Sequence, residues 1–299
     1  MDPKCLVDMK AQQKTGHLDY ATWHPASERT LRDRLRYATL EVLSTLHDPK
    51  PALTTPRVQF IYIHHVFRDE EQALRSLLLH LSKSHSFISH SEAVEKVRTG
   101  NIDRPFLAFS SDDGFRNNLN ASRVFAEFDI SACFFLNPST IGMTNPAEIE
   151  KFCASRLHAK PVDFLSWAEV EELQKAGHEI GSHSWGHHNL SALSEQGLKE
   201  DLTQSRDILS SYCGPIAHFA YPYGRWHHFH RRGMNLVHSI GHQSCATAER
   251  GCHLHKTDLS QNMLLRDHII TGWPLKHIDH FLSQNVRKAM SQDTQPIPE

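Results

Sequence analysis

Two adjacent carboxylates follow an apolar stretch of this chain. Residues 108–115 read AFSSDDGF and place Asp112 and Asp113 directly after a run that is typical of a buried strand. Neighbouring carboxylates repel each other, so the pair requires either a solvated turn or a cation beside it. Gly114 permits a sharp turn. The stretch by itself therefore leaves two interpretations open, a surface turn and a cation site.

Two histidines form a second pattern. Residues 177–190 read GHEIGSHSWGHHNL, in which an expected strand ends at Ser182 and is followed by His183 and His187. The His-x-x-x-His spacing can place two imidazoles on one side of a helical turn, within reach of one ion. His188 is an alternative ligand that spacing alone does not exclude.

Asp113, His183 and His187 together supply three nitrogen and oxygen ligands for one divalent ion, which we expect to be zinc. Three protein ligands leave a position open for water, which is typical of a catalytic rather than a structural site. The charge of the ion would also relieve the repulsion between the two carboxylates. Asp112 would then stay ionised as a free base.

A third pattern is the turn-forming stretch FAYPYGRW at residues 219–226, which contains Pro222 and Gly224. A rigid turn after a strand can aim a backbone N–H at a substrate oxygen. An ordinary structural turn is the alternative.

The elements that must position these residues follow from the alternation of short apolar runs with longer amphipathic ones after Val58. This alternation predicts a parallel sheet, open or closed into a barrel, with the site at the C-terminal ends of the strands. The expected strands span 58–66, 105–110, 130–136, 178–182, 216–221, 243–247 and 264–270. The expected helices span 70–83, 89–98, 115–128, 166–176 and 194–212.

Two domains are expected. Residues 1–55 form an N-terminal helical extension, with a helix over 27–47 that ends at a proline-rich stretch, and residues 56–299 form the barrel. The segment 139–163 is long for a connection and is expected to be an insertion over one end of the barrel.

The composition argues against a nucleic-acid-binding protein and against a membrane-spanning one. The chain has 299 residues, a net charge of −2, 24 histidines and six cysteines without a C-x-x-C pair. No basic run indicates nucleic-acid binding, and no apolar run reaches membrane-spanning length. The N-terminus lacks the apolar region of a signal peptide. We therefore expect a cytoplasmic protein with reduced thiols.

The ordered set SSDDG, HSWGHH and FAYPYG resembles the polysaccharide deacetylase family, also called the NodB-homology or carbohydrate esterase 4 family. The resemblance extends from about Ile61 to Ala248. It implies a deformed (β/α) barrel and a divalent metal held by Asp113, His183 and His187. It also implies that Asp112 is the catalytic base.

The same resemblance implies further roles. The backbone N–H of Tyr223 would stabilise the oxyanion, and Arg266, in LLRDHII, would orient Asp112. The stretch FAYPYG is similar to the branch that deacetylates poly-β-1,6-N-acetylglucosamine, in which an early histidine is catalytic. In YIHHVF, His64 takes that place as general acid, with His65 and His268 as alternatives.

Two departures from the family pattern qualify its implications: Ser110 and Ser111 precede the aspartates, and Ala220 stands where an arginine is often found. The function implied is a metal-dependent hydrolase that removes an N-acyl group, expected to be acetyl, from an amino sugar in surface polysaccharide biosynthesis. The alternatives are a deformylase or another amide hydrolase on the same barrel, and a non-catalytic carbohydrate-binding relative. The expected partner is an amino-sugar or polysaccharide-precursor substrate.

Overall fold

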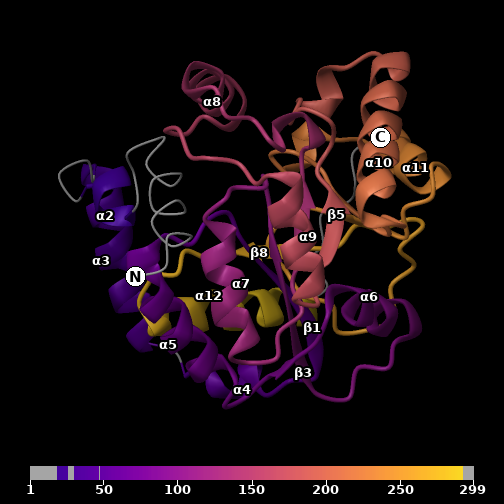
Figure 1. Cartoon of the computed structure of the whole chain (residues 1–299). Helices are drawn as coiled ribbons and strands as arrows, with labels where there is room; N and C mark the ends of the chain where they lie inside the picture. The colour runs from indigo at the N-terminus through magenta and orange to yellow at the C-terminus, as the bar shows by residue number, and fades with distance from the viewer. Residues whose placement is uncertain (1–18, 26–29, 47, 292–299) are drawn as a thin grey trace.

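Parallel strands form the centre of the molecule in the computed structural model, which describes residues 19–25, 30–46 and 48–291 (Figure 1). Around the sheet the strand order is β7-β6-β5-β4-β3-β1-β8, and the short β2 pairs with β3. In chain order the strands are β1 (Arg57–Ile63), β2 (Ser86–Phe87), β3 (Pro105–Ser111), β4 (Cys133–Leu136), β5 (Glu179–Ser182), β6 (His218–Ala220), β7 (Ser244–Ala246) and β8 (Arg266–His268).

The sheet closes on itself almost completely, because the residues that lead into β8 hydrogen-bond to β7. The N–H of Leu264 donates to the carbonyl of Cys245 at 2.9 Å, and the N–H of Thr247 donates to the carbonyl of Leu264 at 2.9 Å. At its other edge β8 pairs with β1, where His268 lies opposite Tyr62. The expected (β/α) barrel is therefore confirmed.

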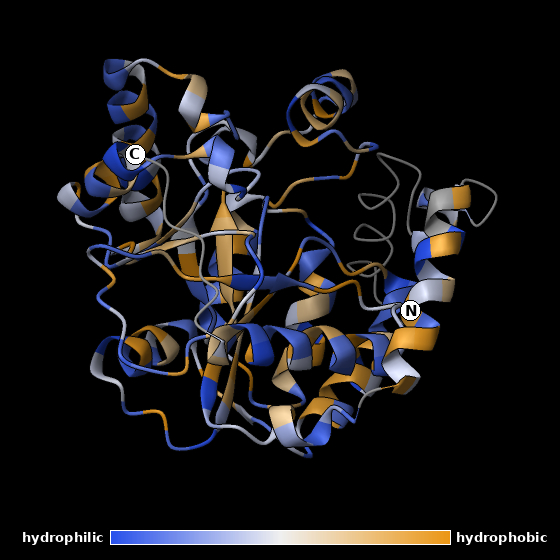
Figure 2. Cartoon of the chain, turned by 180° about the vertical axis from the view of Figure 1, so that it is seen from behind, coloured by the Kyte–Doolittle hydropathy of each residue, from blue (hydrophilic) through white to orange (hydrophobic). Residues whose placement is uncertain are grey.

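Helices surround the barrel, and Figure 2 shows that these helices carry both hydrophobic and hydrophilic residues. In α5, the leucines 74, 77, 78 and 81 recur at helical spacing and are all buried. The helices are α2 (Tyr20–Trp23), α3 (Leu31–Leu46), α4 (Lys50–Leu53), α5 (Glu71–Leu81), α6 (His90–Thr99), α7 (Asn118–Ala126), α8 (Pro146–Phe152), α9 (Trp167–Lys175), α10 (Glu195–Cys213), α11 (Arg231–Ser239) and α12 (Leu275–Met290).

Every expected strand and helix of the barrel is present, with ends within a few residues of the expected ones. The structure adds α2 and α4 before the barrel, and β2, α8, α11 and α12 within it, none of which the sequence patterns predicted. None of the helices in the described ranges is long and apolar enough to cross a membrane.

The helices that precede β1 pack against the last helix of the barrel, since α3 and α4 both contact α12. Glu41 of α3 accepts a hydrogen bond from Lys276 and lies 3.1 Å from Nε2 of His277. Helix α3 falls within the expected range 27–47, of which 27–29 and 47 lie outside the described residues. The division into an extension and a barrel at residue 55 stays a prediction.

The long connection at 139–163 contains α8 and a π-helical turn, Cys153–Leu157. Figure 1 shows α8 projecting from one end of the molecule, away from α4 and α5. Leu157 and Ala159 from this connection line a cavity at the C-terminal ends of the strands. The connection therefore bears directly on the site.

Candidate active site

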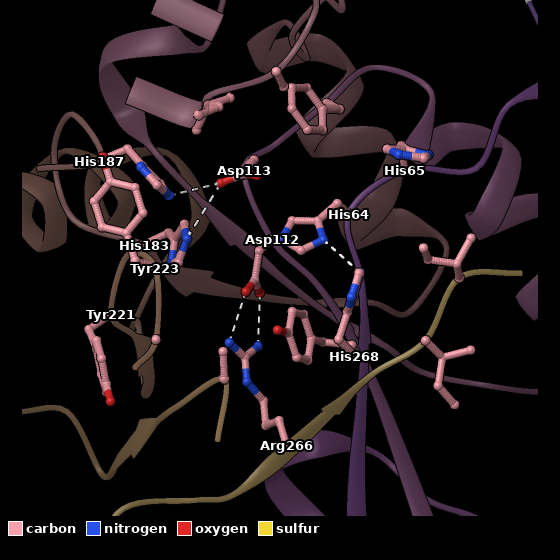
Figure 3. A pocket seen from close by; sticks show the side chains of 18 of the residues that line it. His64, His65, Asp112, Asp113, His183, His187, Tyr221, Tyr223, Arg266 and His268 are labelled. Atoms are coloured by element: carbon pink, nitrogen blue, oxygen red, sulfur yellow. Dashed lines mark hydrogen bonds and ion pairs between the residues drawn. The ribbon is translucent and has the colours of Figure 1, made fainter. Parts of the chain in front are cut away.

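Asp112 forms a bidentate ion pair with Arg266 at the C-terminal end of β3. The two carboxylate oxygens of Asp112 accept from Nη1 and Nη2 of Arg266, both at 2.8 Å, and both side chains are buried (Figure 3). Burial alone would raise the pKa of Asp112, but the charge and hydrogen bonds of Arg266 hold this pKa below its usual value. Asp112 is therefore ionised, and its position is fixed by the guanidinium.

Arg266 is itself held by its surroundings. Its Nε donates to the carbonyl of Thr247 at 2.7 Å, and its guanidinium lies 4.5 Å from the ring centre of Tyr62. The geometry is what the expected orienting role of Arg266 requires, and the role itself stays a prediction.

The two serines that depart from the family pattern both make contacts at the site. The hydroxyl of Ser110 accepts from Nη1 of Arg266 at 3.2 Å, and the hydroxyl of Ser111 donates to the carbonyl of His64 at 3.4 Å. The sequence offered no signal for either contact, because both partners are far away in the chain.

Asp113, His183 and His187 lie together, as the spacing predicts. Oδ1 of Asp113 lies 3.5 Å from Nε2 of His183 and 3.4 Å from Nε2 of His187, and one ligand atom from each residue falls within 4.8 Å of the others. All three residues are buried. Oδ1 of Asp113 has no hydrogen-bond partner among the described residues. Such an orphaned carboxylate oxygen facing two imidazoles fits a divalent cation.

The loop after β5 presents the two imidazoles. Nδ1 of His183 donates to the carbonyl of Ala220 at 2.7 Å, which leaves Nε2 to face Asp113. The hydroxyl of Ser184 accepts from the N–H of His187 at 3.1 Å, and the side chain of Asn137 donates to the carbonyl of Ser184 at 3.2 Å. The sequence motifs did not indicate Ser184 and Asn137 as supports of this loop.

The protonation of the two imidazoles differs. Burial lowers the pKa of His187 to about 4, so this ring is neutral near pH 7. Burial also acts to lower the pKa of His183, but the nearby carboxylates of Asp112 and Asp113 raise it overall. The negative charge at this site therefore favours a cation, whether a proton or a metal ion.

His188, the alternative ligand, is directed elsewhere. Its Nδ1 lies 2.9 Å from Oδ2 of Asp201, and Oδ1 of Asp201 accepts from the N–H of Trp185 at 2.9 Å. The three ligand atoms that come together are those of Asp113, His183 and His187. His188 and Asp201 thus stabilise the loop after β5 and do not contribute to the group of three ligand atoms.

His64 and His268 form a pair beside Asp112. Nδ1 of His64 lies 3.1 Å from Nε2 of His268, and Figure 3 shows the ring of His64 between Asp112 and His268. Burial lowers the pKa of both histidines. His65, the other alternative, lies 3.5 Å from the carboxylate of Glu70 and also borders the cavity. The structure thus brings all three candidate acids to one cavity.

Tyr223 reaches the site from the turn after β6. Its ring centre lies 4.7 Å from that of His187, and its hydroxyl donates to the carbonyl of Arg156 at 2.8 Å. The backbone N–H of Tyr223 donates to none of the described residues. This N–H is free for a substrate oxygen, as the expected role requires.

Several site residues have left-handed backbone conformations. The φ angles are 73° at Asp113, 65° at Ser184, 50° at His187 and 62° at Tyr223. Non-glycine residues seldom adopt these angles, which are concentrated at functional sites in proteins. The three strand-end turns are thus shaped to present particular side chains.

These residues surround a cavity of about 270 Å³. It is lined by the predicted metal ligands, Asp112 and Arg266, all three candidate acids and the Tyr223 turn. Trp23, from the region before β1, also lines it. The sequence gives no signal for Trp23, because nothing near it in the chain forms a motif.

Comparison with known proteins supports the fold of this site. The barrel is similar to IcaB from Ammonifex degensii, with a TM-score of 0.59 and 16% identity over 76% of this chain and 97% of that one. It is also similar to a de-N-acetylase from Aggregatibacter actinomycetemcomitans, with a TM-score of 0.57 and 15% identity over 75% and 99% of the two chains. A third similar structure is that of the deacetylase PplD from Streptococcus pyogenes, with a TM-score of 0.57 and 14% identity over 77% of this chain and 98% of that one.

No curated protein sequence matches this chain. The sequence model of one family does match it, over residues 99–243, and that family is described as polysaccharide deacetylase. The matched residues include the strand-end aspartates and both histidine ligands of the candidate site. The family resemblance expected from the three motifs is thereby confirmed: residues 99–243 of this chain match the polysaccharide deacetylase family, and the barrel has the fold of the similar structures.

Proposed function

We propose that this chain is a metal-dependent N-deacetylase of an amino sugar, acting in the biosynthesis of a surface polysaccharide. The observation that carries the proposal is the buried set Asp113, His183 and His187 next to an ionised Asp112. The match of residues 99–243 to the polysaccharide deacetylase family and the titles of two similar structures, which name deacetylases, support it.

A metal fits the residues present. The unpartnered Oδ1 of Asp113 faces Nε2 of both histidines, and His183 is oriented by a carbonyl on its other nitrogen. Two imidazoles and one carboxylate are a usual ligand set for catalytic zinc. When bound, such an ion polarises an amide carbonyl and makes its water more acidic.

The chain's own residues would supply the remaining chemistry. Asp112, held ionised by Arg266, accepts the proton of the attacking water. The free N–H of Tyr223 donates to the oxygen that becomes negative as the carbonyl is attacked. His64, in its imidazolium form, donates a proton to the leaving amine and returns to the neutral ring; the contact of its Nδ1 with Nε2 of His268 leaves its own Nε2 for this transfer.

The test measures acyl release from N-acetylglucosamine and its oligomers, with added zinc and with chelator. Acetate release that depends on zinc and is lost in Asp112→Asn supports the proposal. Faster release from N-formyl substrates would favour a deformylase. Binding of the sugar without any acyl release would favour a non-catalytic relative and would overturn the proposal.

The place of action is also a proposal, namely a reducing compartment such as the cytoplasm, where the substrate would be an activated precursor. It is supported by the described cysteines, all of which are free, whereas Cys5 lies outside the described residues. Fractionation of native cells tests it. Recovery of the protein outside the cytoplasm, with a preference for the finished polymer, would contradict it. The free cysteines are Cys133, Cys153, Cys213, Cys245 and Cys252.

A further inference from the structure

One wall of the cavity comes from a helix outside the region that matches the family. Trp23, the last residue of α2, lines the cavity together with Asp112 and Asp113. The family match covers residues 99–243 only. The chain thus brings an aromatic side chain of its own to the substrate cavity.

Helix α2 is fixed to the barrel at its N-terminal end. The two oxygens of Asp69 accept from the backbone N–H groups of Tyr20 at 2.8 Å and Ala21 at 3.1 Å. The ring of Trp23 lies 4.9 Å from that of His65, edge to face, and 5.4 Å from that of Phe67. These contacts hold Trp23 in the wall of the cavity that the predicted metal ligands also line.

The connection after α8 joins this wall to the opposite side of the cavity. Nζ of Lys160 donates to the carbonyl of Trp23 at 3.0 Å, and the carbonyl of Arg156 accepts from the hydroxyl of Tyr223. Between them, Leu157 and Ala159 face the cavity. Residues 156–160 therefore run from the Tyr223 turn to α2 and close the cavity on that side.

The chemistry of this wall suits a sugar. The indole ring offers an apolar face, on which the C–H groups of a pyranose ring can pack, and an N–H donor for a hydroxyl. That N–H is buried and has no hydrogen-bond partner among the described residues. The cavity, about 270 Å³, lies just below the usual range for ligand pockets, about 300–1,000 Å³, and suits one sugar ring rather than several.

We propose that Trp23 binds the sugar ring whose N-acyl group faces Asp112, and that α2 with residues 156–160 limits the substrate to a single or chain-terminal amino sugar. The inference rests on the proposed function, because it takes the substrate to be an N-acyl amino sugar. It assigns Trp23 the role of a substrate-binding residue that sets specificity.

The first experiment measures binding without turnover. The full chain, supplied with zinc and carrying Asp112→Asn, is titrated calorimetrically with N-acetylglucosamine and with its β-1,6-linked trimer. We expect both sugars to bind equally within about threefold. Trp23→Ala should weaken both by about tenfold, and Trp23→Phe, which keeps the ring, by less than about threefold.

A matched control is Trp167→Ala, because Trp167 stacks on Tyr212 at 3.8 Å and lies outside the cavity lining. It should leave binding unchanged. Asp69→Ala removes the anchor of α2 and should weaken binding as Trp23→Ala does. The two losses should not add in the double variant, since both act through the same wall. Should Trp23→Ala fail to fold, the two single variants Trp23→Phe and Asp69→Ala still test whether Trp23 binds the sugar.

Three results would overturn the inference: unchanged affinity in Trp23→Ala, a trimer that binds more than about tenfold tighter than the monomer, or no binding of either sugar.

A kinetic experiment separates the role of Trp23 from the proposed function. Trp23→Ala should raise KM for N-acetylglucosamine and leave kcat nearly unchanged. Binding as expected with no acetate released by the unmodified chain would overturn the function alone. Acetate release with an unchanged KM would overturn the role of Trp23 alone.

Discussion

Asp112 and Asp113 are neighbours with opposite surroundings: one faces a guanidinium, the other two imidazoles. Asp112→Asn should therefore retain zinc but lose about 10²–10⁴-fold in turnover, because an amide cannot accept the water's proton. Asp113→Asn should lose zinc itself. Metal content after dialysis and acetate release, measured on both variants, test the difference. Equal loss of metal in the two variants would mean that these roles are wrongly assigned.

Arg266 offers a second test at this scale. Arg266→Lys keeps the charge but cannot make two parallel hydrogen bonds to Asp112. We expect turnover to fall about 10–100-fold, as for other residues that orient a reacting group. The matched control is Arg98→Lys, since Arg98 pairs with Glu95 on the exposed surface of α6. An unchanged rate in Arg266→Lys would exclude an orienting role.

The residues that could be predicted from the sequence are those whose partners lie in the same short motif. His183 and His187 are four residues apart, so local spacing was enough to bring them together. His188 was left open as a ligand because its partner, Asp201, lies on the following helix. The roles of Trp23 and Ser110 could not be predicted, since they depend on contacts with distant parts of the chain.

Among the elements, the turn after β6 is tightly constrained by the backbone of a neighbouring segment. Gly224 has a φ of 64°, and a Cβ added there would lie 2.3 Å from Cβ and 2.4 Å from N of Ala248. Gly224→Ala should lower the free energy of unfolding by about 1–3 kcal/mol and reduce turnover, because it displaces Tyr223. Urea denaturation and acetate release measure the two effects.

Gly142→Ala is the matched control for this turn. Gly142 also has a positive φ, 81°, but an added Cβ would meet nothing within 4 Å. Only the backbone strain should remain, about 1 kcal/mol, with turnover unchanged. Equal effects of the two substitutions would show that the close approach to Ala248 is unimportant.

The barrel strands could be predicted because each is a short apolar run between turn residues. Helix α12 could not, for a physical reason: its buried face contains His277, His280, Ser283 and Asn285 besides three apolar residues. A polar inward face hides the apolar periodicity that marks a helix. Helix α8 was hidden by its shortness and its initial proline.

For the whole molecule, buried histidines set the response to acid. Burial lowers the pKa of His85, His178, His242 and His253 to about 4, from an ordinary value of 6.5. Between these two pH values the unfolded chain binds more protons at these residues than the folded chain does. Stability should therefore fall as pH falls from 6.5 to 4, by about 1.4 kcal/mol per pH unit for each residue.

Urea denaturation at several pH values between 7.5 and 5 measures this slope. His253→Gln provides a control, because Nε2 of His253 accepts from the N–H of Leu265 and a glutamine oxygen can do the same. This variant should reduce the slope by about 1.4 kcal/mol per pH unit. A stability that stays constant down to pH 5 would contradict the neutral state of these histidines.

The left-handed backbone at Asp113, His187 and Tyr223 has a consequence for laboratory evolution. Glycine adopts such angles without strain, so replacement by glycine would relieve about 1 kcal/mol of backbone strain at each position, apart from the effect of removing the side chain. A library screened only for heat resistance would then be enriched in variants that lack the metal ligands or the ring of Tyr223. Selection for thermal stability alone would therefore favour variants without activity. A screen that is meant to retain activity must measure turnover from its first round.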